Sequence, residues 1–341
     1  MSNRYLVKDI ALQAGVSEAT VDRVLNHRPG VRAHTARRVE QALRELDRQS
    51  TQLGLAGRKF IIDIVMEAPP RFTEAVRAAL EAELPGLHPA LFRCRYQTHE
   101  TMPAAGMASM LQRIALRGSN GVLLKARDDE AIVASVAALA RAGIPVVTLV
   151  TDLPASPRTA YVGIDNRIAG ETAAYLLGEW LGDAPAEILV SLSSNLFHGE
   201  EEREAGFRHA IGRRRPPPGI VTITEGHGNH GETGLLARAA LARHPGIEAV
   251  YSIGGGNTAL LDAFVAAGRC CRVFIGHDLD AENIALLHAG RLSAVLHHDL
   301  RQDMRAACQQ IMRAHRALPA ATSAPRSGVQ IATPYNLPET V

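Results

Sequence analysis

Apolar residues near the start of the chain recur at the spacing of short amphipathic helices. The first predicted helix covers 8–14, and its apolar face consists of Ile10, Ala11 and Ala14. Gly15 follows, a residue that readily adopts the left-handed conformation common at helix ends. Ser17 is a suitable N-cap for a second helix, whose inward face consists of Val21, Val24 and Leu25. The chain therefore begins with two short helices joined by a tight turn.

A third amphipathic pattern over 32–47 would close a small core over these helices, with a buried face made of Val39, Ala42, Leu43 and Leu46. Two helices joined by a glycine-containing turn form the helix-turn-helix unit, which places its second helix in the major groove of DNA. The outward strip of that helix consists of Ala19, Asp22, Arg23 and Asn26. Arg23 is the best candidate for reading a base, because a guanidinium can bind O6 and N7 of guanine together. Two ordinary surface helices with a solvated arginine are the alternative.

From Phe60 onward, strand patterns and helix patterns alternate. The predicted strands cover 60–68, 90–97, 121–126, 145–150, 187–193, 220–225, 249–254, 272–278 and 292–298. The predicted helices cover 73–84, 102–116, 129–142, 166–181, 200–211, 231–243, 258–267, 281–289 and 300–315. Such alternation specifies parallel sheets covered by helices on both faces. There are more strands than one sheet comfortably holds, so we expect two lobes with a cleft between them.

The expected architecture is an all-α helix-turn-helix head on an α/β two-lobed body with parallel sheets. The head covers 1–47, a polar linker with two glycines covers 48–59, and the ligand-binding body covers 60–341. The two lobes cover about 60–162 with 298–326, and about 163–297 with 327–341. Ligands of such sheets bind beyond the carboxyl ends of the strands, so polar residues at those ends are the candidates for a site.

Charge is distributed unevenly along the chain. The first 60 residues hold 11 Lys and Arg against 6 Asp and Glu, a net charge of +5, whereas the whole chain has a net charge of +2. A basic head on a mildly acidic body is expected when one end meets phosphates. Aromatic residues make up only 4% of the chain, which argues against single-strand binding through stacked bases.

No signal-like or membrane-spanning apolar run is evident, so we expect a cytoplasmic protein without a membrane partner. The four cysteines have no spacing typical of metal ligands and are interpreted as buried reduced thiols: Cys94, Cys270, Cys271 and Cys308.

The head resembles the lactose-repressor (LacI) family of bacterial transcription regulators. The resemblance lies in KDIALQAGVSEATVDRVLN (8–26) and the following PGVRAHTARRVEQALREL (29–46). It implies that Glu18, Ala19 and Arg23 contact bases. The full predicted DNA-contacting set consists of Val7, Ser17, Glu18, Ala19, Thr20, Arg23, Asn26 and Leu55. Asp22 departs from the family, which usually has serine there, and its carboxylate would be repelled by phosphates.

The linker resembles the family's hinge segment, which folds on operator DNA and inserts a leucine into the minor groove. Leu55 is the candidate for that role. The usual proline is missing and Gly54 weakens a helix, so a flexible tether with Leu55 packed on the body is the alternative.

The body resembles the type I periplasmic sugar-binding fold that LacI-family regulators carry. The clearest markers are VGIDNRIAG (162–170) and EREAGF (202–207), and the resemblance implies three crossings between lobes, near Val162, His297 and Ser327. The candidate effector-binding residues are Phe72, Asp152, Asp165, Arg203, Asn257, Asp278 and His298.

Each candidate has a structural alternative. Arg203 can grip hydroxyls or a carboxylate with its fork of donors, or lie on a helix surface. Asp278 and Asp165 can bind a ligand or cap the following helix, and for Asp165 capping is favoured. Phe72 can stack on a sugar ring or belong to the core. Turn or capping roles are the alternatives for Asp152, Asn257 and His298.

Two patterns are interpreted as coincidental. The segment 226–231 matches the GxGxxG spacing of dinucleotide sites, but no acidic residue ends the next strand about 20 residues later. Four histidines could suggest a metal, but regularly spaced further ligands are missing: His227, His230, His297 and His298. We therefore expect neither a cofactor nor a metal.

These features predict a sugar-responsive, LacI-type regulator that is not an enzyme. We expect a homodimer, because one helix-turn-helix reads half of a palindromic operator in double-stranded DNA. The sequence does not name the effector, but the hydroxyl-binding candidates fit a sugar, a sugar acid or a cyclitol alike. A transporter's solute-binding protein would share the body but lack the basic head. An NAD-dependent α/β enzyme would need a cofactor loop or an activated nucleophile, for which only the weak glycine pattern is present.

Overall fold

The computed structural model describes residues 5–182, 185–320 and 326–337. Its head contains α1 (Val7–Ala14), α2 (Glu18–Leu25) and the amino-terminal half of α3 (Ala33–Leu55). Gly15 ends α1 in the left-handed conformation, with φ of 61°. The buried core of the head consists of Ile10, Ala11, Ala14, Val21, Val39 and Ala42. These are periodic apolar positions, so the sequence pattern explains how the three helices pack.

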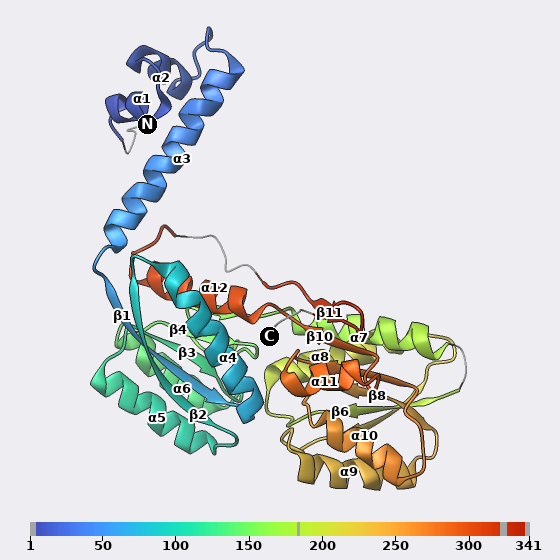
Figure 1. Ribbon diagram of the computed structural model, residues 1–341. Helices are drawn as coiled ribbons and strands as arrows, with labels where there is room; N and C mark the ends of the chain where they lie inside the picture. Colours follow the sequence, from blue (N-terminus) through green and yellow to red (C-terminus); the bar gives the residue numbers. More distant parts are fainter. Residues whose placement is uncertain (1–4, 183–184, 321–325, 338–341) are drawn as a thin grey trace.

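Helix α3 connects the head to the body. It continues to Leu55, well beyond the end predicted at residue 47, because residues 48–55 contain no proline and only Gly54 weakens the helix. The segment expected to be a linker is therefore helical over most of its length. Figure 1 shows α3 descending from the head to the first lobe, so that the head stands apart from the body.

The first lobe is a five-stranded parallel sheet in the order β2-β1-β3-β4-β5. Its strands are β1 (Lys59–Glu67), β2 (Leu91–His99), β3 (Gly121–Lys125), β4 (Val146–Leu149) and β5 (Ala160–Val162). Its helices are α4 (Pro70–Glu83), the 3-10 helix η1 (Leu84–Leu87), α5 (Ala104–Arg117), α6 (Glu130–Arg141) and α12 (Leu300–Ala314). The two buried clusters of this lobe contain residues of α4 with α12 and of α5 with α6, as a doubly covered sheet requires.

The second lobe has a six-stranded sheet in the order β11-β10-β9-β8-β6-β7. Its strands are β6 (Glu187–Ser191), β7 (Gly219–Ile223), β8 (Ile247–Ser252), β9 (Val273–His277), β10 (Ala294–His297) and β11 (Gln330–Ala332). Its helices are α7 (Asn166–Leu181), α8 (His198–Ile211), α9 (His230–Arg243), α10 (Asn257–Ala266) and α11 (Ala281–His288). Every strand pair is parallel except β10 with β11, which is antiparallel.

The chain passes between the lobes at three places. It leaves the first lobe after β5 and returns after β10, before α12. The third passage lies between α12 and β11, where Ser327 forms an isolated parallel bridge with Ile164. The expected second-lobe range extends to 341, of which 338–341 lie outside the described residues.

The predicted fold class, a helical head on a two-lobed α/β body with parallel sheets, is confirmed. Among the described residues, no helix is both long and apolar enough to cross a membrane.

Candidate functional site

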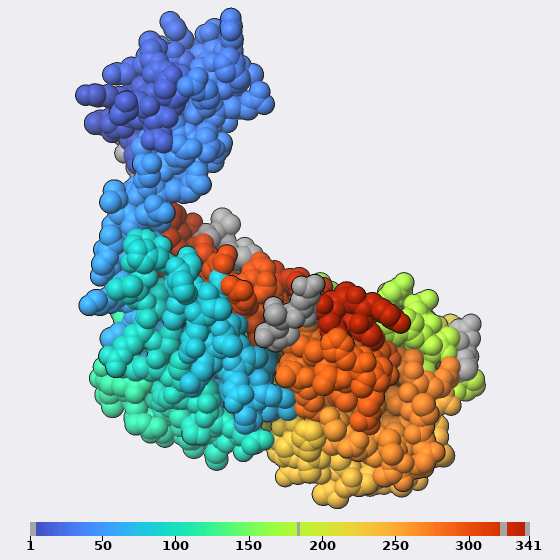
Figure 2. All heavy atoms as spheres, viewed as in Figure 1, coloured from blue at the N-terminus to red at the C-terminus, as the bar shows by residue number. Residues whose placement is uncertain are grey.

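The outward face of α2 presents the residues predicted to read DNA. Ala19, Arg23 and Asn26 are exposed, whereas Val21 is buried against the head's own core. Ser17 begins the helix as its N-cap and accepts a hydrogen bond from Thr20 N at 3.3 Å. Figure 2 shows the head projecting away from the body, so its surface is free to approach a duplex. Each of these positions was predicted from helical periodicity.

Asp22 has local partners that change its electrostatic effect. Its carboxylate accepts from Arg28 Nη1 at 3.0 Å and from Asn26 Nδ2 at 2.7 Å. The arginine offsets the negative charge, so the repulsion from phosphates is smaller than the sequence suggests. Asn26 Nδ2 also donates to the backbone oxygen of Asp22 at 3.0 Å, so both of its hydrogens are used within the head and one must be released for Nδ2 to donate to DNA.

Two predicted DNA-contacting residues, Leu55 and Val7, pack against hydrophobic cores in the described conformation. Leu55 is 5% exposed and belongs to the first lobe's buried cluster, together with Phe60 and Ala317. Val7 is partly buried and packs on the head's core. The described conformation therefore matches the body-packed alternative for Leu55, and a minor-groove role would require this leucine to leave the lobe.

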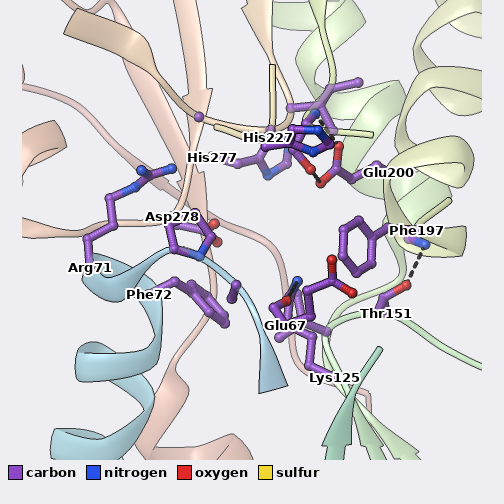
Figure 3. A pocket seen from close by; sticks show the side chains of 18 of the residues that line it. Glu67, Arg71, Phe72, Lys125, Thr151, Phe197, Glu200, His227, His277 and Asp278 are labelled. Carbon is purple, nitrogen blue, oxygen red and sulfur yellow. Dashed lines mark hydrogen bonds between the residues drawn. The ribbon is translucent and has the colours of Figure 1, made fainter. Parts of the chain in front are cut away.

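A cleft between the lobes forms the second candidate site. Residues at the carboxyl ends of β1, β3 and β4 line one side, and residues following β6, β8 and β9 line the other. The predicted residues Phe72, Arg203 and Asp278 all line this cleft. Figure 3 shows Phe72 and Phe197 on opposite sides of Glu67 and Lys125.

Lys125 is the central cation of the first lobe's wall. It ends β3, donates to the backbone oxygen of Glu67 at 3.0 Å, and lies 4.2 Å from the centre of the Phe197 ring. Burial lowers the pKa of its ammonium, and the carboxylates of Glu200 and Glu67 act in the opposite direction. Glu67 itself forms an ion pair with Arg127. Lys125 is therefore a hydrogen-bond donor held beside two aromatic rings, with Phe72 as the second at 5.9 Å.

Arg203 is the corresponding cation of the second lobe. It is 4% exposed, and its Nε donates to Asn166 Oδ1 at 2.8 Å. The two helices that carry these residues, α7 and α8, pack closely because of two glycines. A Cβ on Gly170 would lie 1.9 Å from the Arg203 oxygen, and one on Gly206 would lie 2.1 Å from the Arg167 oxygen. The glycines of IAG and AGF thus explain how the arginine reaches the cleft.

Acceptors and a buried histidine complete the second lobe's wall. Glu200 accepts from Ser193 N at 2.7 Å and from Ser193 Oγ at 2.5 Å. His277 Nε2 lies 2.9 Å from Tyr251 Oη, and burial places the pKa of this histidine well below its usual value, with Arg203 acting in the same direction. Asp278 has a positive φ of 67°, a costly conformation for a residue other than glycine. Such strain is typical of residues held for function.

The other four predicted effector residues do not line the cleft. Asp165 caps α7 through Ile168 N at 3.1 Å, as favoured from the sequence, and pairs with Arg326. Asp152 pairs with Arg158 and accepts from Thr148 Oγ1 at 2.8 Å. Asn257 Nδ2 donates to Asn283 Oδ1 at 2.6 Å, and buried His298 contacts Asp303. Asp165 and Asp152 thus match the capping and turn alternatives, whereas Asn257 and His298 are held by buried side-chain partners instead of capping a helix.

Several lining residues were missed by the sequence analysis. They are Glu67, Arg71, Lys125, Thr151, Ser193, Phe197, Glu200, His227, His277 and Asp280. Many follow or end a strand, so the strand-end rule itself could have identified them. Among the described residues, no group of three His, Cys, Asp or Glu side chains is arranged to hold a metal ion.

The fold and the cleft define a two-lobed ligand-binding protein that carries a helix-turn-helix head. Residues 68–317 match the model of the periplasmic binding protein domain, and residues 6–48 match that of the bacterial regulatory proteins of the lacI family. The chain therefore belongs to the periplasmic binding protein domain family, and its head is similar to the DNA-binding segment of the lacI-family regulators.

Individual proteins are similar to parts of this chain. The chain is 30% identical over 172 residues to an HTH-type transcriptional regulator of Streptomyces lividans, an alignment that spans about half the length of that relative (46%) and 47% of this chain. A glucose-galactose binding protein from Geobacillus stearothermophilus has a TM-score of 0.73 at 21% identity, covering 82% of this chain and 99% of the other. A Bacteroides fragilis structure described as a LacI transcriptional regulator has a TM-score of 0.72 at 15% identity, covering 82% and 98%.

Proposed function

We propose that this protein binds an operator in double-stranded DNA as a homodimer and regulates transcription in response to a small effector bound in its cleft. The observation that carries the DNA-binding part is the exposed Arg23 face of α2, on a head that stands apart from the body. Two copies are invoked because one such helix covers half of a palindromic site. The regulator acts on chromosomal DNA, and therefore in the cytoplasm.

The chemistry of the cleft favours a compact, polyhydroxylated effector. Asp278 and Glu200 offer carboxylate acceptors for hydroxyl groups, and Arg203 and Lys125 offer charged donors. Phe72 and Phe197 offer apolar ring faces against which the C–H face of a sugar can pack. This combination suits a sugar, a sugar acid or a cyclitol, and the structural similarity to a glucose-galactose binding protein supports the same class.

The regulation follows from linkage between the cleft and the head. Helix α3 is continuous from the head core to Leu55, which packs in the first lobe, so movement of that lobe carries the head with it. An effector changes operator affinity only as far as it binds one lobe arrangement more tightly than the other.

Thermal shift of the full chain against a panel of neutral sugars, sugar acids and cyclitols tests the effector class. We expect at least one compound to raise the melting temperature in a saturable manner, because a ligand that binds only the folded state stabilises it. The same compound should change the affinity of the protein for its operator. A panel that leaves the melting temperature unchanged would count against this class of effector.

A further inference from the structure

The glycine-rich segment 226–231 lies in the second lobe, at the mouth of the cleft. It connects β7 to α9, beside a second glycine-rich loop, 254–256, that connects β8 to α10. Gly228 and Gly255 both have positive φ, 66° and 87°. A Cβ on Gly228 would lie 2.5 Å from the oxygen of Gly254, so the two loops are in close contact.

An arginine from the other lobe fills the space between these loops. Arg71 extends from the first turn of α4, and Figure 3 shows both its side chain and Asp278 in the left part of the view. Its Nε lies 3.1 Å from Asp280 Oδ2, and its Nη1 donates to the oxygen of Gly228 at 3.1 Å. A Cβ on Gly255 would lie 2.0 Å from Arg71 Nη2. The guanidinium therefore occupies a receptacle that a side chain at residue 255 would close.

The receptacle is complementary to a planar cation. Asp280 supplies a carboxylate that is 9% exposed, and Arg71 is 27% exposed, so water screens this pair less than it screens an exposed pair. Burial raises the pKa of Asp280, and the neighbouring Arg71 acts against that rise. Removing the arginine would leave a largely buried carboxylate without its cation, which is costly.

The same geometry argues against a dinucleotide at these glycines. A dinucleotide phosphate would need free amides at the start of α9. One of these amides, Glu232 N, already donates to the N-cap Asn229 Oδ1 at 2.9 Å. Glu232 also places a carboxylate in the first turn of α9, which would repel a pyrophosphate. Gly228 and Gly255 instead leave space for the Arg71 guanidinium, and the Gly228 oxygen accepts a hydrogen bond from it.

We propose that Arg71, Asp280, Gly228 and Gly255 form a cross-lobe clasp that holds the mouth of the effector cleft closed. The clasp is made entirely of protein groups, so it favours the closed arrangement before any effector contributes. An effector then needs less of its own binding energy to bring the lobes together, and its affinity rises. This inference rests on the proposed function for the role of the cleft, but the clasp itself can be tested without an effector.

Hydrogen exchange of the full chain, measured by mass spectrometry without added ligand, tests the clasp directly. In Arg71→Ala and in Asp280→Asn, we expect exchange in segments 226–231 and 254–256 to become about tenfold faster, the size typical of one charged hydrogen bond. A backbone hydrogen bond from Asp128 N to the Leu196 oxygen (2.9 Å) also joins the lobes and stays in place, so the change should be local. Arg77→Ala is the matched control, because Arg77 lies on the same helix and packs on Tyr96 of its own lobe.

The double variant Arg71→Ala with Asp280→Asn shows whether the two residues act through one shared interaction or affect hydrogen exchange independently. If the residues act together, the double variant should exchange no faster than either single variant. Additive effects, or unchanged exchange in both single variants, would overturn the clasp.

Isothermal titration with each compound of the sugar and cyclitol panel then connects the clasp to the effector. For a compound that binds the wild type, Arg71→Ala should raise the Kd about tenfold, whereas Arg77→Ala should not. An unchanged Kd in Arg71→Ala would overturn the role of the clasp in affinity. If exchange accelerates as expected and no panel compound binds the wild type, the clasp stands and the proposed effector class fails.

Discussion

The head and the cleft are built in opposite ways. The predicted DNA-contacting surface comes mainly from one eight-residue helix, α2, whose outward residues are exposed. The cleft is assembled from loops and strand ends distributed from Glu67 to Asp280, and many of its side chains are buried and bonded to one another. A contiguous surface leaves a recognisable sequence motif. An assembled one depends on the packing of the whole body.

This difference has consequences for mutation. Exposed residues of α2 can change DNA affinity without disturbing the fold, because the Arg23 side chain is exposed and is not part of the head's buried core. Arg203 and Asn166 of the cleft wall are buried and hydrogen-bonded to each other, so a substitution there affects both binding and stability.

The largest effect is expected for Arg203→Ala. It removes a buried cation that faces the cleft and leaves Asn166 Oδ1 without its donor, so effector affinity should fall by about 100-fold. Calorimetric titration measures the loss, and Arg208→Ala on the exposed side of the same helix is the control, since Arg208 pairs with Glu204. Equal losses in the two variants would remove Arg203 from the effector site.

Arg23→Ala tests whether DNA binding by the head can be lost without changing effector binding in the cleft. Losing one bidentate contact to guanine should weaken specific operator binding by about 2 kcal/mol, whereas effector binding should be unchanged. Fluorescence anisotropy with specific and scrambled duplexes measures the two affinities. The exposed Arg141 at the end of α6 provides a control, Arg141→Ala, with the same change in net charge. A simultaneous loss of effector binding would contradict a separable head.

Gly206→Ala and Gly54→Ala compare a tight contact with an open helix position. The Cβ at 206 would meet the Arg167 oxygen, so we expect a loss of about 2 kcal/mol in the free energy of unfolding of the second lobe. Urea denaturation followed by the fluorescence of Trp180, on the neighbouring α7, measures it. No atom lies within 4 Å of a Cβ at Gly54 in α3, so Gly54→Ala should instead stabilise the helix by about 0.5 kcal/mol. Destabilisation of similar size at both positions would refute the close packing of α7 and α8.

A smaller effect than that of Gly206→Ala concerns the pH dependence of stability. His277 has a lowered pKa in the folded protein, so the unfolded chain binds a proton below about pH 6.5 that the folded one does not. Stability should therefore fall as the pH decreases from 7.5 to 5.5, and His277→Gln should reduce that fall by about 1 kcal/mol. Urea midpoints at the two pH values provide the measurement. Identical pH dependence in the variant would show that His277 does not titrate differently on unfolding.

The sequence predicted the head more completely than the cleft for a physical reason. Helical periodicity identifies Val21 as buried and Arg23 as outward from a few neighbouring residues, and the alternation of strands and helices identifies the two-lobed body. Arg203 and Asp278 were found because the segments that contain them, EREAGF and RVFIGHD, resemble the family's effector-binding segments. The predicted end of α3 was wrong, because polar composition at 48–55 does not prevent a helix.

What the sequence missed depends on contacts between distant segments. Lys125 ends a buried strand, but its position beside Phe197 requires both lobes to be in place. Arg71 looks like an ordinary helix-start arginine until Asp280 and Gly255 are brought next to it. Asp152 and Asn257 fit the strand-end rule, yet they bond to Thr148 and Asn283 and do not line the cleft. Strand-end position shows which residues can reach the cleft, and tertiary packing decides which ones do.

Selection of the full chain on a pool of random-sequence duplexes, in parallel with Arg23→Ala, tests most directly that an exposed helix of a separate head reads DNA. We expect the wild type to enrich a palindromic sequence whose half-sites match two copies of α2, and the variant to lose that enrichment. Failure of the wild type to enrich any sequence, or enrichment of the same palindrome to the same extent by Arg23→Ala, would contradict the account.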